Sequence, residues 1–170
     1  RLQGHWERRD WPATATLVPL VPAIDPRPVF FWLNGARIIA YDFPAWRIAA
    51  GGGEQKLPAA ARGRIRREQA EAGLAFLDTA MKFHPASSEI WIERANIELN
   101  CVGDVAAAAE SYRRASGLPG SPCHAARLHA QLLRRLGRRS EALAWLVGLH
   151  PRLSSPDKVA AADVVLERIR

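Results

Sequence analysis

The feature that most constrains this chain is an internal repeat. Residues of the same kind recur 34 positions apart in the second half of the 170-residue sequence. The matched pairs are Leu99 with Leu133, Gly103 with Gly137, Ala108 with Ala142, and Tyr112 with Leu146. Toward the N-terminus, Gly73, Leu77 and Ala80 precede Ala108, Tyr112 and Ala115 by 35 positions. A period of this length is typical of stacked helical hairpins, each of which buries its apolar face against its neighbours.

Each repeat predicts a pair of antiparallel helices. The first helix offers a small residue, Ala95, where a neighbouring helix crosses closely, and a large residue, Leu99, about one turn later. Gly103 then ends that helix in a left-handed turn. The second helix repeats the alternation with Ala108 and Tyr112. Small and large residues in this order let antiparallel helices interdigitate.

The rest of the chain also reads as helices. Sustained alternation of apolar and polar residues is missing, so we expect an all-α fold without strands. Asp25 is expected to cap a helix that runs to Tyr41, and Ser121 to cap one that runs to Leu136. The other expected helices cover 13–20, 62–84, 87–101, 105–116, 140–149 and 156–170.

Residues 42–61 read as a loop. They contain Pro44, a Gly triplet at 51–53, and Pro58. Trp46 and Ile48 indicate that part of this loop packs down onto the domain. The Gly triplet lacks the following Gly-Lys-Ser/Thr of a phosphate-binding loop.

The repeat resembles the tetratricopeptide repeat. The family's spacing is filled by Ile92, Ala95, Leu99, Gly103, Asp104, Ala108, Tyr112 and Ala115. A second match covers 123–154, where His129 replaces a small or aliphatic residue, and a split match covers 29–85. The resemblance implies a short right-handed α-solenoid of antiparallel helix pairs, with about three repeats and a terminal capping helix.

We therefore expect one domain over residues 1–170. A Trp- and Pro-rich segment at 1–28 precedes a first repeat at 29–85 that carries the 42–61 loop as an insertion. The second and third repeats span 86–120 and 121–154, and the capping helix spans 155–170.

The resemblance also implies a function, that of a non-catalytic protein–protein interaction module or adaptor. Such repeats bind a peptide or a partner subunit in a concave groove that is lined by the first helix of each repeat. Carried over by position, the lining is Arg37, Tyr41, Glu93, Ile97, Asn100, His124, Arg127, Gln131, Arg134 and Arg135.

The charge distribution favours an acidic ligand. The net charge is +7. The stretch from Arg113 to Arg152 contains eight arginines and a single acidic residue, Glu141. Concentrated positive charge attracts anionic partners, although the same Arg residues also serve to solvate helix faces. Two alternatives stay open. One is a helical repeat that binds nucleic acid through its Arg clusters. The other is a structural subunit that docks through its aromatic N-terminal third, as a homo-oligomer or in a larger assembly.

Several classes of function have no support in the sequence. No catalytic constellation is recognisable, so we expect no enzyme, no cofactor and no metal. The candidate ligands Cys101, Cys123, His124 and His129 lack metal-site spacing. The sequence contains no run of 18 apolar residues, so we expect no segment that spans a membrane. Two cysteines fit a reducing cytoplasm, with the bacterial envelope as the alternative if a targeting segment has been removed.

Overall fold

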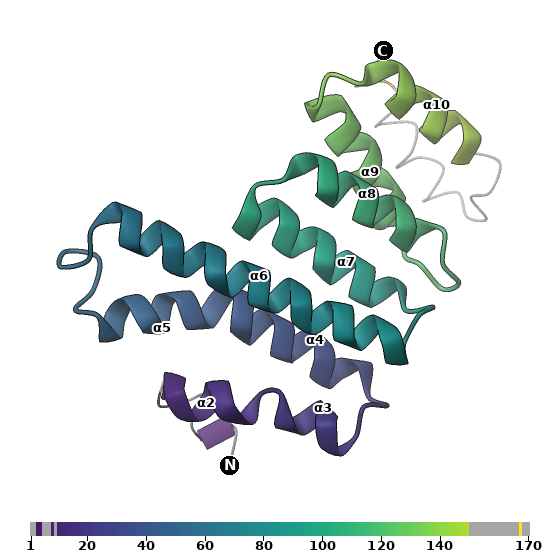
Figure 1. Ribbon diagram of the computed structural model, residues 1–170. Helices are drawn as coiled ribbons and strands as arrows, with labels where there is room; N and C mark the ends of the chain where they lie inside the picture. Colours follow the sequence, from purple (N-terminus) through teal and green to yellow (C-terminus); the bar gives the residue numbers. More distant parts are fainter. Residues whose placement is uncertain (1–2, 5–7, 9, 150–166, 168–170) are drawn as a thin grey trace. The chain divides into compact units, whose positions relative to one another are not determined.

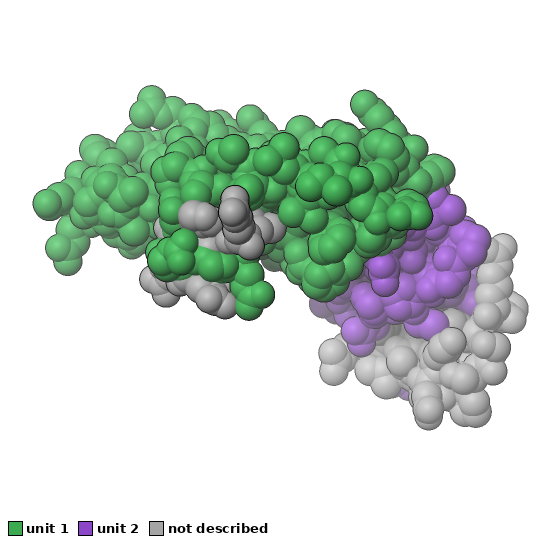
Figure 2. Space-filling view, turned by 90° about the horizontal axis from the view of Figure 1, so that it is seen from below, with its two compact units in different colours: residues 1–85, 100–102 green, residues 86–99, 103–170 purple. Residues whose placement is uncertain are grey.

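The protein is described by a computed structural model that covers residues 3–4, 8, 10–149 and 167. Within these residues all regular structure is helical and no strand occurs, which confirms the expected all-α fold. The chain divides into two compact units (Figure 2). The first unit contains residues 1–85 and 100–102, and the second contains residues 86–99 and 103–170. The expected capping helix at 155–170 lies outside the described residues, apart from residue 167.

The first unit is built around one long helical path. Its helices are α2 (Trp11–Leu17), α3 (Leu20–Ile24), α4 (Val29–Arg37), α5 (Phe43–Ala50) and α6 (Ala59–Phe83). A π-helical turn, η1 (Ile38–Asp42), joins α4 to α5 without a break. The path α4–η1–α5 packs along α6, while α2 and α3 pack against α5 and α4 (Figure 1).

The structure corrects the expected loop at 42–61. Residues Phe43–Ala50 are helical, and the connection to α6 is only residues 51–58. Phe43 and Ile48 are buried, so the apolar pattern of α4 continues through α5. Pro44 lies in the first turn of α5, where a helix tolerates proline.

Pro44 also explains the π-helical turn before it. Proline has no N–H, so Pro44 cannot donate the helical hydrogen bond to the carbonyl of Ala40, four residues earlier. The Cys101 thiol donates to that carbonyl instead, with Sγ 3.8 Å from the oxygen. Next to it, the Gln69 amide, oriented so that both of its ends are satisfied, donates to the carbonyl of Ile39 at 3.3 Å. Two side chains from elsewhere in the first unit therefore donate to carbonyls of this π-helical turn.

The start of α4 also differs from the expectation. Pro28 stands at the N-cap and Asp25 does not cap the helix. Instead Asp25 pairs with Arg27, whose Nε donates to it at 2.8 Å. The carbonyl of Pro26 accepts from Trp32 Nε1 at 2.9 Å. Trp32 is buried against two rings of α6, Phe76 and Phe83.

The second unit is a series of consecutive helices. They are α7 (Ser88–Ile97), α8 (Val105–Ser116), α9 (Cys123–Arg135) and α10 (Arg139–Leu149). The π-helical turn η2 (Glu98–Val102) follows α7, and its residues 100–102 belong to the first unit. Each helix packs against the next along the chain (Figure 1). The expected bounds of α8 and α10 agree with these to within one residue.

Caps and glycines set these helix ends. Asp104 caps α8 by accepting from the Ala107 N–H at 2.9 Å. Gly103 and Gly137 have φ of 81° and 78°, the left-handed conformation expected at the ends of the first helices. Ser121 does not cap α9, because Pro122 occupies the N-cap without a side-chain bond.

The core of the second unit consists largely of alanine. Its fully buried alanines include Ala95, Ala108, Ala115, Ala125, Ala130 and Ala142. Larger side chains fill the space around these crossings, and their polar groups hydrogen-bond to one another. The Tyr112 hydroxyl donates to Asn96 Oδ1 at 2.6 Å, and the buried Glu98 carboxylate accepts from Ser111 Oγ at 2.7 Å.

His129, the departure from the repeat pattern, is buried between neighbouring helices. Its Nδ1 donates to the carbonyl of Ala109 on α8 at 2.7 Å. Its ring meets Trp145 of α10 edge to face, with centroids 4.7 Å apart. Burial is the main cause that lowers the pKa of His129, and the positive charges of Arg113 and Arg138 act in the same direction. The Ala109 hydrogen bond and the Glu110 charge oppose this shift.

Two glycine variants test the packing of the first unit. A Cβ at Gly35 of α4 would lie 2.6 Å from the Phe76 ring, whereas a Cβ at Gly63 of α6 would meet nothing within 4 Å. We expect Gly35→Ala to lower the free energy of unfolding by about 1–3 kcal/mol through overpacking. Gly63→Ala should raise it by about 0.5–1 kcal/mol through helix propensity. Urea unfolding followed by circular dichroism measures both, and a stabilised Gly35→Ala would contradict the close packing.

The lowered pKa of His129 predicts a pH dependence of stability. The unfolded chain takes up a proton near the ordinary pKa of about 6.5 while the folded chain does not. Stability should therefore decrease as pH falls below that value, until the folded pKa is reached. His129→Asn, which retains an N–H donor, should flatten the decrease in urea titrations between about pH 7.5 and 5. The matched variant His124→Asn, at an exposed position of α9, should show the same decrease in stability with falling pH as the unaltered chain.

Candidate functional site

The exposed side of α9 carries a row of polar and basic side chains. Helix α9 buries Ala125, Ala126, His129, Ala130, Leu132 and Leu133. Residues three or four apart on a helix share a face, so the exposed residues also form one row. This row, called the basic stripe below, consists of His124, Arg127, Gln131, Arg134 and Arg135.

Two guanidiniums of the basic stripe meet no acidic partner among the described residues. In the part of the chain that the structure describes, no carboxylate pairs with Arg127 or Arg135. Other arginines of the second unit are neutralised locally. Arg113 and Arg114 share Glu110 at 2.7 and 2.9 Å. These two guanidiniums lower the pKa of Glu110 to about 2.

The remaining expected groove residues are not all at the surface. Glu93 and Ile97 are buried, at 2% and 0% exposure, and so present no surface to a ligand. Arg37 is exposed and lies at an apolar depression of the first unit beside Phe30 and Phe31.

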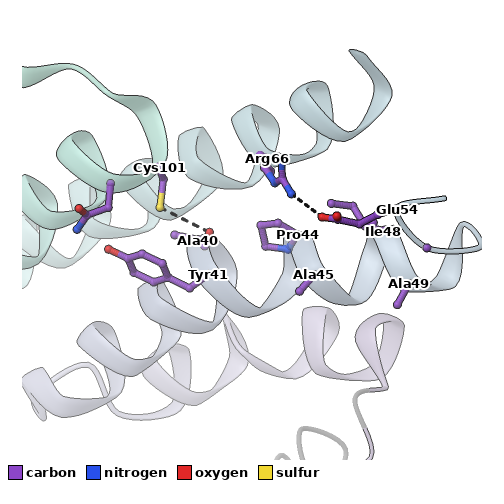
Figure 3. Close-up of a pocket in the computed structure, with 11 residues that line it drawn as sticks. Ala40, Tyr41, Pro44, Ala45, Ile48, Ala49, Glu54, Arg66 and Cys101 are labelled. Carbon is purple, nitrogen blue, oxygen red and sulfur yellow. Dashed lines mark hydrogen bonds and ion pairs between the residues drawn. The ribbon is translucent and has the colours of Figure 1, made fainter. Parts of the chain in front are cut away.

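Tyr41 and Asn100 line one pocket of the first unit. The pocket has a volume of about 400 Å³. Figure 3 shows Tyr41 of η1 followed by Ala45 and Ala49 of α5, with Cys101 of η2 above them. The full lining is Ala40, Tyr41, Pro44, Ala45, Ile48, Ala49, Gly53, Glu54, Arg66, Asn100 and Cys101.

Charged groups stand at one end of this pocket. Arg66 Nη2 of α6 lies 3.0 Å from Glu54 Oε1 (Figure 3). Arg62 approaches the other oxygen of the same carboxylate at 3.3 Å. Two guanidiniums therefore meet one carboxylate, which leaves an excess positive charge at this rim. Arg62 Nε is buried and finds no hydrogen-bond partner within the described part of the chain.

The fold matches a solved structure of a repeat protein. The crystal structure of a thermophilic TPR protein from Thermus thermophilus aligns with 97% of this chain and 77% of its own chain, at a TM-score of 0.54 and 15% identity. The chain has the tetratricopeptide repeat fold. No protein-family model matches the sequence, and no curated protein matches it. The resemblance therefore rests on the repeat pattern and the fold.

The basic stripe and the pocket contain the expected groove residues that remain at the surface, apart from Arg37. The basic stripe lies on α9. Tyr41 and Asn100 lie in η1 and η2, which continue the helices α4 and α7. Sequence reasoning missed Glu54, Arg66 and Cys101 as pocket residues, because their place beside Tyr41 and Ala45 depends on packing between segments distant in the sequence.

Other kinds of site find no support in the described residues of this tetratricopeptide fold. Among them no three His, Cys, Asp or Glu side chains gather closely enough to hold a metal ion. In the same residues no helix combines the length and apolar character needed to cross a membrane.

Proposed function

We propose that this chain is a non-catalytic protein-interaction module, and that its basic stripe binds an acidic, partly apolar segment of a partner protein. The observation that carries the proposal is the exposure of Arg127 and Arg135 on one face of α9 without acidic partners among the described residues. Arginine forms paired hydrogen bonds to a carboxylate, which makes such a pair selective for acidic side chains.

The length of the basic stripe defines the ligand further. At about 1.5 Å per residue, Arg127 and Arg135 are separated by about 12 Å along the axis of α9. An extended peptide rises about 3.3 Å per residue, so side chains four residues apart are separated by about 13 Å. The stripe therefore fits an extended segment with two acids four residues apart. Gln131 lies between the two arginines and offers an amide to the peptide backbone.

A labelled peptide tests this geometry. The probe is an extended nine-residue peptide with two glutamates four residues apart and leucines between them. The variant is Arg127→Ala combined with Arg135→Ala, and the matched control is Arg64→Ala with Arg67→Ala, two exposed arginines of α6. Fluorescence anisotropy should show binding weakened about tenfold or more by the stripe variant, because each lost charged hydrogen bond is worth about 1.5–3 kcal/mol.

Two results would contradict the proposal. Equal weakening by the stripe variant and by the α6 control would mean that only net charge matters. Tighter binding of a random single-stranded RNA, lost on the same stripe variant and with a steeper salt dependence, would indicate a nucleic-acid ligand. A peptide whose glutamates are two residues apart serves as a spacing control and should bind more weakly.

A further inference from the structure

The pocket of the first unit is lined by two π-helical turns. Ala40 and Tyr41 belong to η1, and Asn100 and Cys101 belong to η2. Turns of this kind are rare and occur frequently at functional sites, because they redirect the side chains that follow them. Here two of them contribute to the same pocket, and a hydrogen bond from Cys101 to the Ala40 carbonyl joins them.

The walls of the pocket are formed mostly by small, apolar side chains. Tyr41, Ala45 and Ala49 follow one another at a spacing of four residues, and both alanines are exposed. Pro44 and Ile48 are buried beside them. At about 400 Å³ the pocket is at the small end of the range for ligand sites. That volume suits one large side chain and its neighbouring backbone.

Polar groups of the pocket lining remain able to form hydrogen bonds or ion pairs with a ligand. Arg66 and Glu54 are 55% and 66% exposed, so their ion pair contributes little stability and exchanges readily. Arg62, which lies outside the lining, adds a second positive charge beside the same carboxylate, 3.3 Å from Glu54 Oε2. The exposed amide of Asn100 makes no hydrogen bond within the described residues.

We propose that this pocket binds one aromatic or branched aliphatic side chain of the partner segment, next to a carboxylate held by Arg66. The proposal rests on the proposed function for the kind of ligand, an acidic and partly apolar segment. The apolar walls select the side chain through the hydrophobic effect. The excess positive charge at the Arg62 and Arg66 rim selects the neighbouring acid, and Asn100 is placed to bond the peptide backbone.

The smallest molecule that carries both features is the first probe. N-acetylphenylalanine combines an aromatic side chain with a carboxylate, its amide analogue lacks the charge, and N-acetylglycine lacks the side chain. Cys101 is a half-buried thiol in the pocket lining that forms no disulfide, and Cys123 of α9 is an internal reference. N-acetylphenylalanine should slow the alkylation of Cys101 by iodoacetamide about threefold or more, because thiol reactivity follows access. The amide should protect less, N-acetylglycine should not protect, and the rate at Cys123 should not change.

Pocket-filling variants provide the second arm of the test. Ala45→Trp occupies the pocket from an exposed position and should abolish protection of Cys101 by N-acetylphenylalanine. Ala75→Trp, at an exposed position of α6 outside the lining, should leave protection unchanged. Ala49→Leu is a milder filling variant that should reduce protection, and circular dichroism verifies that each variant folds. Absence of protection in the unaltered chain, or equal protection in Ala45→Trp, would overturn the proposal.

The experiment separates the pocket from the basic stripe. The Arg127 and Arg135 variant alters no pocket residue, so its Cys101 protection should equal that of the unaltered chain. Protection of Cys101, together with peptide binding that the stripe variant does not weaken, would support the pocket and remove the proposed function. Peptide binding that the stripe variant weakens, without protection of Cys101, would support the proposed function and overturn the pocket proposal.

Discussion

Helices in this chain approach one another closely because alanine stands where they cross. Ala95 and Ala108 are fully buried in the second unit, as Ala36 and Ala70 are in the first. A small side chain at a crossing lets the larger neighbours interdigitate around it, as Tyr112 does with Asn96. The 34-residue recurrence follows from this requirement, because each hairpin must offer its small and large residues in the same order. The exposed face of α9 is in turn the face that remains once its alanines and leucines are buried.

The pocket has a different origin, which is a backbone hydrogen bond that cannot form. Pro44 removes the N–H that Ala40 would use, and the helix passes through a π-helical turn at this point. The Cys101 thiol and the Gln69 amide then satisfy the carbonyls of Ala40 and Ile39. An unpaired carbonyl in this partly buried place would cost free energy, so these two hydrogen bonds stabilise the helix as it passes Pro44. Cys101, which donates to the Ala40 carbonyl, also lines the pocket, as do Ala45 and Ala49, which follow the proline along α5.

How much the sequence predicts depends on the range of the interactions. Gly103 and Asp104 act within a few residues, so the turn and the cap that they form could be predicted. The basic stripe could be predicted for the same reason, since helical spacing alone places Arg127 and Arg135 on one face. The helix through Pro44 was missed because its support comes from Cys101, far along the chain. The burial of Glu93 was missed because it depends on packing and not on spacing.

A core built from alanine also determines how the protein deforms. An alanine side chain has no rotamers, so the core of the second unit cannot adapt by rearranging side chains at its crossings. A stress applied at one helix must instead move its neighbours as rigid bodies. Such a core transmits small displacements along the stacked helices without absorbing them locally. The turns between these helices contain Gly103 and Gly137 in the left-handed conformation, and glycine is the residue whose backbone changes conformation at least steric cost.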